Sequence, residues 1–409
     1  MNGGGIRIVY VSNHPWEGLR RRAHHLSSAL ARKPGVERVL FVNPRVEAVQ
    51  LPGRRRGPAG ERYDSRRSSR RRAEEEGPAL VTPVRWVPLS GRVKALARLN
   101  AATEIRRIER GAGGPFVLLG NAIGGHMEEI VAGLARRHPF LFDWTDDFSR
   151  FEAYRRNPEA LRRLEKRIAL YVGLARGVIA VNAHVAAEAR RAGADPSVVP
   201  NGADMEGMAP ALGPLPIPAP LADLGDRPVL GYAGVFTGAR IDADLIDGAL
   251  ERLPGWTLVV LGDRDETLAA RFLGRPEVRF LPPVPPAELP AWYGRFTVCV
   301  IPHLDNEHTR GNDPLKLYEA LAAGRPVVTT PIAGTEPFRE VVEIASDPEG
   351  FARAAERARA EDGPDGAEAR REAVRSCSWS ARADLVLKLV RPIAAGSDAG
   401  PPLRAGSPM

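Results

Sequence analysis

"GNDPLKLYEALAAGRPVVTT", residues 311–330, decides the fold, because a short helical pattern in it leads directly into an apolar run. Asp313 can accept hydrogen bonds from the amides of a first helical turn, and Pro314 suits the first helical position, where a missing N–H costs nothing. The pattern predicts that the helix ends at Gly324, before a strand that is apolar on both faces. A helix and strand of this kind are typical of a parallel α/β sheet.

Outward from this segment, short apolar runs alternate with helical patterns along almost the whole chain. Runs of four to six apolar residues indicate strands covered on both faces, and the helices between them imply βαβ units. We therefore predict an α/β fold of two doubly wound, Rossmann-like parallel sheets facing a central cleft, with ligands at the carboxyl ends of the strands. The predicted strands are 6–11, 38–42, 116–119, 139–143 and 177–181 in the first half, and 228–234, 256–262, 277–281, 297–302 and 325–330 in the second.

Composition suggests where the domains begin and end. At 409 residues the chain is long enough for two or three domains. We predict an N-terminal domain over 1–205, a proline-rich linker over 206–228 and a C-terminal domain over 229–376. A helix over 377–392 can pack back on the N-terminal domain, and residues 393–409 are predicted to form a disordered tail.

Cysteine usage and hydropathy bear on the compartment. The two cysteines, Cys299 and Cys377, are far apart, which argues against a disulfide framework and favours a reducing compartment. No apolar signal-peptide core precedes the first predicted strand, and no apolar run is long and uninterrupted enough to span a membrane. We therefore expect a cytoplasmic protein.

Much of the net charge of +8 is local to residues 52–78, which carry nine arginines and little that could enter a core. A basic, flexible and solvated loop is one interpretation. Another interpretation is that the segment contacts the inner face of an anionic membrane peripherally, or contacts an acidic acceptor. Each basic residue near an anionic membrane surface contributes about 1 kcal/mol of binding free energy. Nucleic acid is not expected as a partner, because no aromatic residues are interleaved for base stacking.

The helix of the opening segment has the features of an anion site. Its first-turn amides and positive dipole end favour a phosphate, and Lys316 adds a full charge in that turn. Glu319 shares a helix face with Lys316 and can accept hydrogen bonds from a diol such as ribose. The alternative is that the two side chains pair with each other on a solvated face.

Four segments together resemble a known family. "DPLKLYEALAAGRPVVTTPIAG" (313–334) is similar to the donor-site signature of the family-4 glycosyltransferases, which have the GT-B fold, in the branch with a Pro-Leu-Lys-x-Tyr-Glu-x-Leu-Ala motif. "VVPNGAD" (198–204), "GYAGVFTGARIDADLI" (231–246) and "LFDWTDDFSRF" (141–151) resemble three further blocks of the same family, in the expected order.

The resemblance implies transfer of a sugar from a nucleoside-diphosphate donor, usually with retention at the anomeric carbon. The nucleotide-sugar is then a substrate, and no cofactor is expected. By the same resemblance, Glu319 holds the ribose, Lys316 and the amides near Leu315 hold the diphosphate, and Arg240 is a further diphosphate contact. The other donor-binding candidates are Pro314, Asp313, Asn312, Arg310, Thr309, Asn306 and Gly234.

The leaving group of such a reaction is a diphosphate, so catalysis needs positive charge beside its oxygens. Lys316, Arg240 and a helix N-terminus can supply that charge without a metal. One departure concerns the sugar: many family members carry two glutamates eight positions apart, and the first would fall on Gly311. Asp313 is nearby but out of register, so the identity of the donor sugar does not carry over.

The N-terminal half is expected to bind the acceptor. Trp16 could stack on a sugar and Arg20 could meet an anionic group, the alternative being a Trp that anchors the loop and an arginine on a solvated helix. Asp143 and Asp146 follow a strand and are the predicted catalytic carboxylates, acting as base or as stabilisers of positive charge, with helix capping as the alternative. The remaining acceptor-binding candidates are His14, Asn121 and His126.

No metal site is predicted, because the histidine pair at 303 and 308 lacks a cysteine or a second strong carboxylate. Together, the residues and the family resemblance predict a glycosyltransferase of polysaccharide biosynthesis that acts on a saccharide or lipid-linked saccharide. A nucleotide-sugar 2-epimerase of the same fold and an inactive nucleotide-sugar-binding protein are the alternatives.

Overall fold

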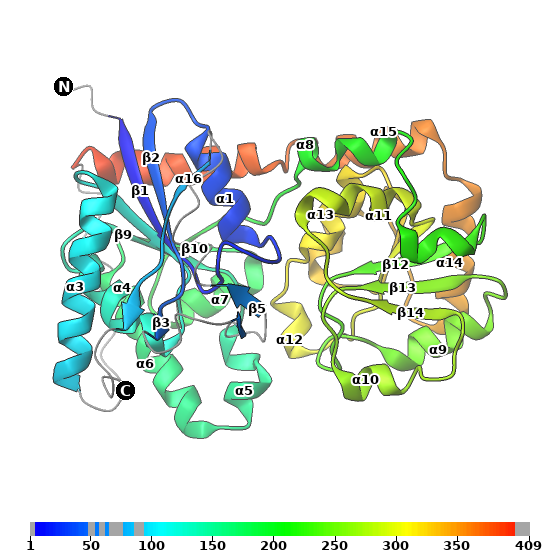
Figure 1. The fold of residues 1–409 in the computed structure, drawn as a ribbon, viewed down its shortest axis with the longest axis horizontal. Coiled ribbons are helices and arrows are strands. Elements are labelled where there is room, and N and C mark those ends of the chain that lie inside the picture. Colours follow the sequence, from blue (N-terminus) through cyan, green and yellow to red (C-terminus); the bar gives the residue numbers. More distant parts are fainter. Residues whose placement is uncertain (1–4, 48–53, 57–61, 65–76, 86–93, 397–409) are drawn as a thin grey trace. The chain divides into compact units, whose positions relative to one another are not determined.

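The chain divides into two compact units in the computed structural model (Figure 1). The first unit comprises residues 1–200 and 379–409, and the second comprises residues 201–378. The structure describes residues 5–47, 54–56, 62–64, 77–85 and 94–396. Most of the basic segment 52–78 and nearly all of the predicted tail 393–409 therefore lie outside the described residues.

A parallel sheet of seven strands forms the centre of the first unit, as far as the chain is described. Its strand order is β11 (Pro196–Val198), β10 (Gly177–Ala180), β9 (Phe140–Trp144), β8 (Val117–Gly120), β1 (Ile6–Val11), β2 (Val36–Val42) and β6 (Ala79–Val81). Two short pairs accompany it: β3 (Val46–Glu47) with β7 (Val84–Arg85), and β4 (Arg54–Arg56) with β5 (Arg62–Asp64).

Helices cover this sheet because its strands are apolar on both faces. Val9 and Val11 belong to the core under α3 (Lys94–Ala112), α4 (Glu128–Ala135) and α6 (Pro158–Leu174). The alternate residues Ile8 and Tyr10 are equally buried and face the other side of the sheet. There α1 (Arg22–Ala31) packs against α16 (Trp379–Ala394), with His25 stacked on Trp379 at 5.2 Å. The other helices in the described part of this unit are α5 (Glu152–Arg155), α7 (Ala183–Arg191), η2 (Gly125–Met127) and η3 (Phe148–Arg150).

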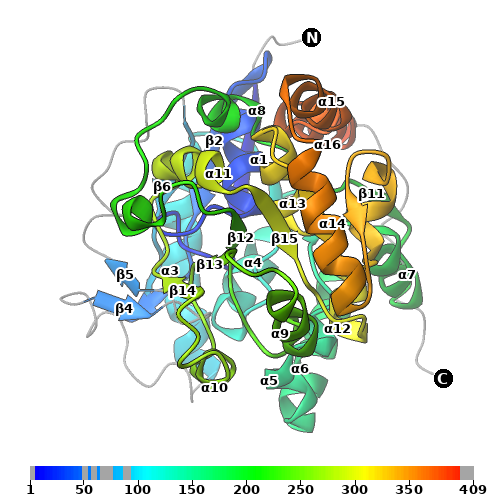
Figure 2. The ribbon, with the colours of Figure 1, turned by 90° about the vertical axis from the view of Figure 1, so that its right-hand side faces the viewer.

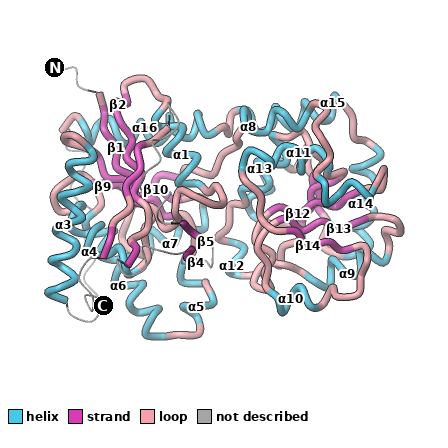
Figure 3. The backbone as a smooth tube through the Cα atoms, in the orientation of Figure 1, coloured by secondary structure: helices cyan, strands magenta, loops and turns pink. Residues whose placement is uncertain are grey.

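The second unit has a parallel sheet of six strands, in the order β14 (Val278–Leu281), β13 (Thr257–Leu261), β12 (Val229–Ala233), β15 (Val298–Ile301), β16 (Val327–Thr329) and β17 (Glu343–Ile344). Two hydrophobic cores lie on its two faces. Figures 2 and 3 show the path of the strands and helices of this unit. One core contains α9 (Ala243–Glu251) and α14 (Pro348–Ala360). The other contains α11 (Leu289–Arg295), α13 (Leu315–Ala322) and α15 (Pro364–Arg375). The remaining helices are α8 (Met205–Met208), α10 (Glu266–Ala270), α12 (Glu307–Arg310), η4 (Ala209–Leu212), η5 (Ala219–Leu224), η6 (Pro286–Glu288) and η7 (Ala333–Phe338).

The two doubly wound parallel sheets confirm the predicted fold class, and all ten predicted strands are present. Strands β6, β11 and β17 were not predicted, because two or three residues give no periodic signal. The segment 206–228 differs from an interdomain linker, since it belongs to the second unit. Its apolar side chains, including Met208, Ala211 and Leu221, are buried in that unit's core.

Helix α13 ends where the sequence predicts. Gly324 has a φ of +70°, and its N–H donates to the carbonyl of Leu321 at 3.0 Å. The N–H of Arg325 donates to the carbonyl of Ala320 at 2.9 Å. These two bonds make a Schellman cap, which requires the left-handed backbone that glycine adopts without cost.

Candidate functional site

The order of strands singles out one place in the second unit. The chain runs from β12 outward to β13 and β14 and then returns to the other side of β12 as β15. The loops that follow β12 and β15 therefore diverge at the carboxyl edge, the side of the sheet at which the parallel strands end. Ligands of open α/β sheets bind at such a switch point. Residues 234–242 and 302–313 form these two loops.

Lys316 in the first turn of α13 reaches this switch point. Its Nζ donates to the hydroxyl of Tyr232 at 2.9 Å and lies 4.2 Å from the centre of the Tyr232 ring. Gly234 makes room for it, because a Cβ there would lie 3.1 Å from Cε and 3.2 Å from Nζ of Lys316. Burial lowers the pKa of Lys316 to about 7; the charge on Arg240 lowers it too, and the carboxylate of Glu319 opposes them.

Arg240 ties the two loops of the switch point together. Its Nε donates to Nε2 of His308 at 3.0 Å, and its carbonyl accepts from the N–H of Leu304 at 2.7 Å. The side-chain amide of Asn306 donates to the carbonyl of Ala239 at 3.0 Å. Two basic side chains, Arg240 and Lys316, are thus held at one place by separate elements.

Glu319 lies one helical turn beyond Lys316 but does not pair with it. Its Oε2 accepts the hydroxyl of Tyr293, from α11, at 2.8 Å. Burial raises the pKa of Glu319, while the Tyr293 hydrogen bond and the charge of Lys316 lower it and Asp204 raises it. The predicted alternative, a solvated Lys316–Glu319 pair, is wrong in this structure, because each side chain is directed to a different tyrosine.

His303, directly after β15, is buried at the same switch point with 2% of its surface exposed. Among the residues that the structure describes, neither ring nitrogen finds a hydrogen-bond partner. Burial holds the pKa of His303 well below its ordinary value, and the charges of Lys316, Arg240 and His308 lower it further. We call Lys316, Arg240, His303 and His308 the basic cluster.

The start of α13 corrects one prediction. Asp313 does not cap the helix: the helix begins at Leu315, Pro314 takes the N-cap position and no side chain caps it. The carboxylate of Asp313 instead accepts the N–H of Asn201 at 2.6 Å and the hydroxyl of Tyr318 at 2.9 Å. Both oxygens thus make contacts within the second unit, and the donor-binding role of Asp313 stays a prediction.

Most other donor candidates make contacts inside their own loop. Asn306 caps α12 by accepting the N–H of Thr309 at 2.9 Å, and Thr309 is buried and donates to the carbonyl of Leu304 at 2.5 Å. Arg310 is paired with Asp305 at 2.8 Å on the surface. Asn312 is buried, and Leu315 is part-exposed at the first position of α13. These side chains shape the loop, and their predicted contacts with a donor stay predictions.

The sheet of the first unit has its own switch point, between β1 and β8. Asn13 connects the two loops there: its Nδ2 donates to the carbonyl of Asn121 at 2.7 Å and its Oδ1 accepts the N–H of Gly124 at 3.1 Å. His126 borders Gly124, where a Cβ would lie 2.6 Å from its Cε1. His14, Asn121 and His126 are thus brought to one corner, and burial keeps the pKa of His14 well below its ordinary value.

Trp16 and Arg20 lie in the same loop but are engaged with the protein. The Trp16 ring meets Phe41 edge-on at 4.9 Å and His24 at 5.4 Å. The guanidinium of Arg20 lies 4.5 Å from the centre of the Trp16 ring. These contacts favour the structural alternative, a tryptophan that anchors the loop.

Asp143 corrects a second prediction. It is fully buried, and its carboxylate accepts Nε of Arg22 at 3.0 Å and the hydroxyl of Tyr10 at 2.6 Å. Since Arg22 is also buried, this carboxylate has its counter-ion in place and is not exposed to a substrate in this structure. Asp146 is part-exposed at the end of β9, so its catalytic role stays a prediction.

Two further features of the first unit lie apart from the predicted residues. Asp147, His184 and Glu188 are close enough to hold a metal ion, but Arg150 lies 3.5 Å from Asp147 and Arg191 pairs with Glu188, so both carboxylates are already compensated.

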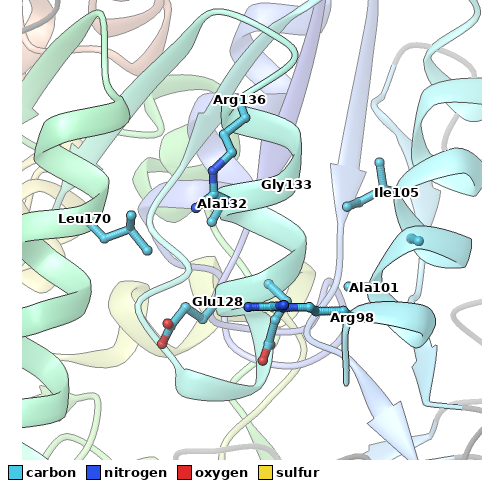
Figure 4. Close-up of a pocket in the computed structure, with 10 residues that line it drawn as sticks. Arg98, Ala101, Ile105, Glu128, Ala132, Gly133, Arg136 and Leu170 are labelled. Carbon is cyan, nitrogen blue, oxygen red and sulfur yellow. The ribbon is translucent and has the colours of Figure 1, made fainter. Parts of the chain in front are cut away.

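A hollow of about 430 Å³ opens between α3, α4 and α6 (Figure 4). Side chains of the three helices line it, among them Arg98, Glu128, Arg136 and Leu170, and no predicted site residue does.

Comparison with known proteins finds a family match within the second unit. Residues 227–360 match the family model of glycosyl transferases group 1. The second unit carries a group 1 glycosyltransferase domain. A stretch of 161 residues is 29% identical to TuaH of Bacillus subtilis (strain 168), which is named as a candidate glycosyltransferase of teichuronic acid biosynthesis. That match covers 37% of this chain and 40% of TuaH, so it spans well under half of the relative's length.

Solved structures show the fold. Sucrose-phosphate synthase from Thermosynechococcus elongatus is 17% identical with a TM-score of 0.66, and the match covers 96% of this chain and all of that one. HepE from Anabaena, solved in complex with UDP, is 14% identical with a TM-score of 0.62, over 94% of this chain and all of HepE. The two parallel-sheet units are therefore those of the GT-B fold.

Within the group 1 domain, reasoning from the sequence missed the tyrosines. Tyr232 and Tyr293 contact Lys316 and Glu319, yet they are 84 and 26 residues away in the chain. His303 was weighed only as a metal ligand. The sequence did carry a signal for His303 as a site residue, because His303 follows a buried strand. The same kind of signal led to the prediction of Asp143 and Asp146.

Proposed function

We propose that this protein transfers a sugar from a nucleoside-diphosphate-sugar, bound at the switch point of the second unit, to a saccharide acceptor bound by the first. Lys316 carries the proposal. It lies in the first turn of a helix beside Arg240, and its ammonium forms no ion pair with a carboxylate in the described part of the chain. A lysine placed in this way needs an anion as its partner.

The residues divide the work of binding and catalysis. Lys316, Arg240 and the first amides of α13 would stabilise the charge that develops on the diphosphate as the glycosidic bond to the donor breaks. Glu319 would accept the ribose hydroxyls, with Tyr293 fixing the orientation of its carboxylate. We propose that this positive charge suffices without a metal and, from the family resemblance, that the anomeric configuration is retained.

The comparisons support the class of donor and the setting of the reaction. HepE was solved with UDP and with UDP-glucose, which favours a uridine nucleotide, although GDP-sugars fit the same charge argument. TuaH is named for teichuronic acid biosynthesis, which favours a role in polysaccharide biosynthesis. We propose a cytoplasmic reaction on a saccharide or lipid-linked acceptor. No helix of the described chain is both long and apolar enough to cross a membrane.

Nucleotide binding tests the proposal. UDP, GDP and their sugars are titrated calorimetrically into the parent chain and into Lys316→Met, Glu319→Gln and the control Lys166→Met, whose side chain is exposed on α6. Removing a charge-assisted contact costs about 1.5–3 kcal/mol, so Lys316→Met should weaken UDP or GDP binding by roughly 10- to 100-fold. Lys166→Met should bind like the parent. Parent-like affinity in both site variants would refute the donor assignment.

Product analysis separates the proposed activity from its alternatives. A glycosylated acceptor formed from the bound donor, in the presence of a chelator, supports metal-free transfer. An isomerised donor sugar formed without acceptor would identify a 2-epimerase. Tight binding with neither transfer nor hydrolysis would identify an inactive binding protein.

A further inference from the structure

Lys316 is the only lysine among residues 201–378, and its surroundings are poor in negative charge. Its Nζ contacts a tyrosine hydroxyl and the face of the same ring, both from Tyr232. That hydroxyl in turn donates to the carbonyl of Val235 at 2.9 Å. The ammonium is therefore held by an aromatic ring and a neutral oxygen, which compensate a positive charge only weakly.

The groups around Lys316 come from several elements, and most of them are basic. The loop after β12 supplies Arg240, and the segment after β15 supplies His303 and His308. Glu319 on α13 is the carboxylate that acts on Lys316, and it is itself held by Tyr293 of α11 and affected by Asp204 at the start of α8. A negative ligand is what would balance this arrangement.

We propose that binding of the donor diphosphate takes up one proton from solvent, and that the amine of Lys316 receives it. This inference rests on the proposed function, since the nucleoside diphosphate is the anion that makes the ammonium favourable. The step is a protonation only: the lone pair of Nζ accepts a proton, and no other bond forms or breaks. The lowered pKa of about 7 supports it, because an anion bound beside the amine would raise that pKa again.

His303 is the rival acceptor within the basic cluster, and the geometry disfavours it. Its two nitrogens are enclosed, whereas Lys316 is a part-exposed residue in the first turn of α13. His308 accepts the Nε–H of Arg240 on its Nε2, so protonation of that nitrogen would break an existing bond. Lys316 is thus the member of the cluster that can meet both solvent and ligand.

Calorimetry of the full chain tests the proposal. UDP is titrated at pH 8.0 in buffers of different ionisation enthalpy, and the slope of observed enthalpy against buffer enthalpy counts the protons taken up. The terminal phosphate of UDP is already ionised there, because its pKa is about 6. We expect uptake of about one proton, and an affinity that falls by up to about tenfold per pH unit above pH 7.5. GDP is the second probe if UDP does not bind.

Two variants assign the proton. Lys316→Arg keeps the charge but cannot lose its proton, so it should bind with no uptake and with an affinity independent of pH. His303→Phe removes the rival and should keep the uptake. Uptake that persists in Lys316→Arg, or is lost in His303→Phe, overturns the assignment to Lys316.

A direct measurement covers the case in which Lys316→Arg does not fold. The chain has only five lysines, so the pH dependence of amine labelling at Lys316 can be followed by mass spectrometry in the parent protein. We expect a titration near pH 7 without nucleotide and a shift to higher pH with UDP. Ordinary lysine behaviour in both states overturns the proposal. Binding without proton uptake defeats only this inference, whereas absence of any binding of UDP or GDP defeats the proposed function.

Discussion

One charged group in each unit shows how differently the two units satisfy their charges. In the first unit, the Asp143 carboxylate is enclosed by Arg22 and Tyr10, and Arg22 also donates to the carbonyl of Pro200 at 3.1 Å. In the second unit, Lys316 has a tyrosine as its partner and basic side chains as neighbours. Both charged groups contact a tyrosine hydroxyl, but their electrostatic balance is opposite.

This difference separates a residue that stabilises the fold from a residue for which we propose an anionic ligand. A buried charge with its counter-ion in place stabilises the folded chain as long as the pair is intact. A lysine with a lowered pKa and no carboxylate partner costs stability until an anion arrives. Charge balance therefore distinguishes the two roles.

The largest expected effect is on stability in the first unit. Arg22→Ala leaves the buried Asp143 carboxylate uncompensated and should lower the free energy of unfolding by about 3–5 kcal/mol. Denaturant unfolding measures it, and UDP binding by the remaining folded protein should be unchanged. The double variant Arg22→Met/Asp143→Leu should recover much of the loss. A single variant as stable as the parent would contradict a structural role for the pair.

A smaller effect of opposite sign is expected in the second unit. Lys316 has a folded pKa of about 7, against about 10.4 in the unfolded chain, so the unfolded chain binds more protons between these values. Its contribution to stability therefore rises with pH in that window and is most unfavourable at pH 7 and below. Lys316→Met should be more stable than the parent at pH 7 by on the order of 1–3 kcal/mol, after allowance for partial exposure.

That gap should close as the pH approaches 10, and unfolding curves of both proteins at pH 6, 7, 8 and 9 measure it. Comparing the two chains cancels the titration of every other group. A constant difference across this range would mean that Lys316 titrates normally, and the contrast between the two units would lose its electrostatic basis.

The smallest expected effect concerns the corner between β1 and β8. Asn13→Ala removes the side-chain bonds to Asn121 and Gly124 and should cost about 1 kcal/mol of stability. Transfer to the acceptor should weaken while UDP affinity stays the same, since the affected loops belong to the first unit. Equal losses in both measurements would show that the two switch points are not separable in function.

Local sequence pattern was enough for the fold and for placing Lys316 and Glu319 on one helix. The strands were predicted because four to six apolar residues in succession are a local signal. The end of α13 was predicted because Gly324 and Pro326 are local signals too. Asp313 was misassigned because its capping role competes with Asn201, which is 112 residues away in the chain. The segment 206–228 was taken for a linker because isolated apolar residues between prolines have no periodicity.

The sequence by itself determined two parallel α/β sheets and a helix start with a lysine and a glutamate on one face. Only the tertiary structure decided that Asp143 is neutralised by Arg22 and that Lys316 faces Tyr232 among other basic groups. The reason is physical: apolar periodicity acts over a few neighbouring residues, whereas the state of a charge depends on every group that folding brings within a few ångströms of it.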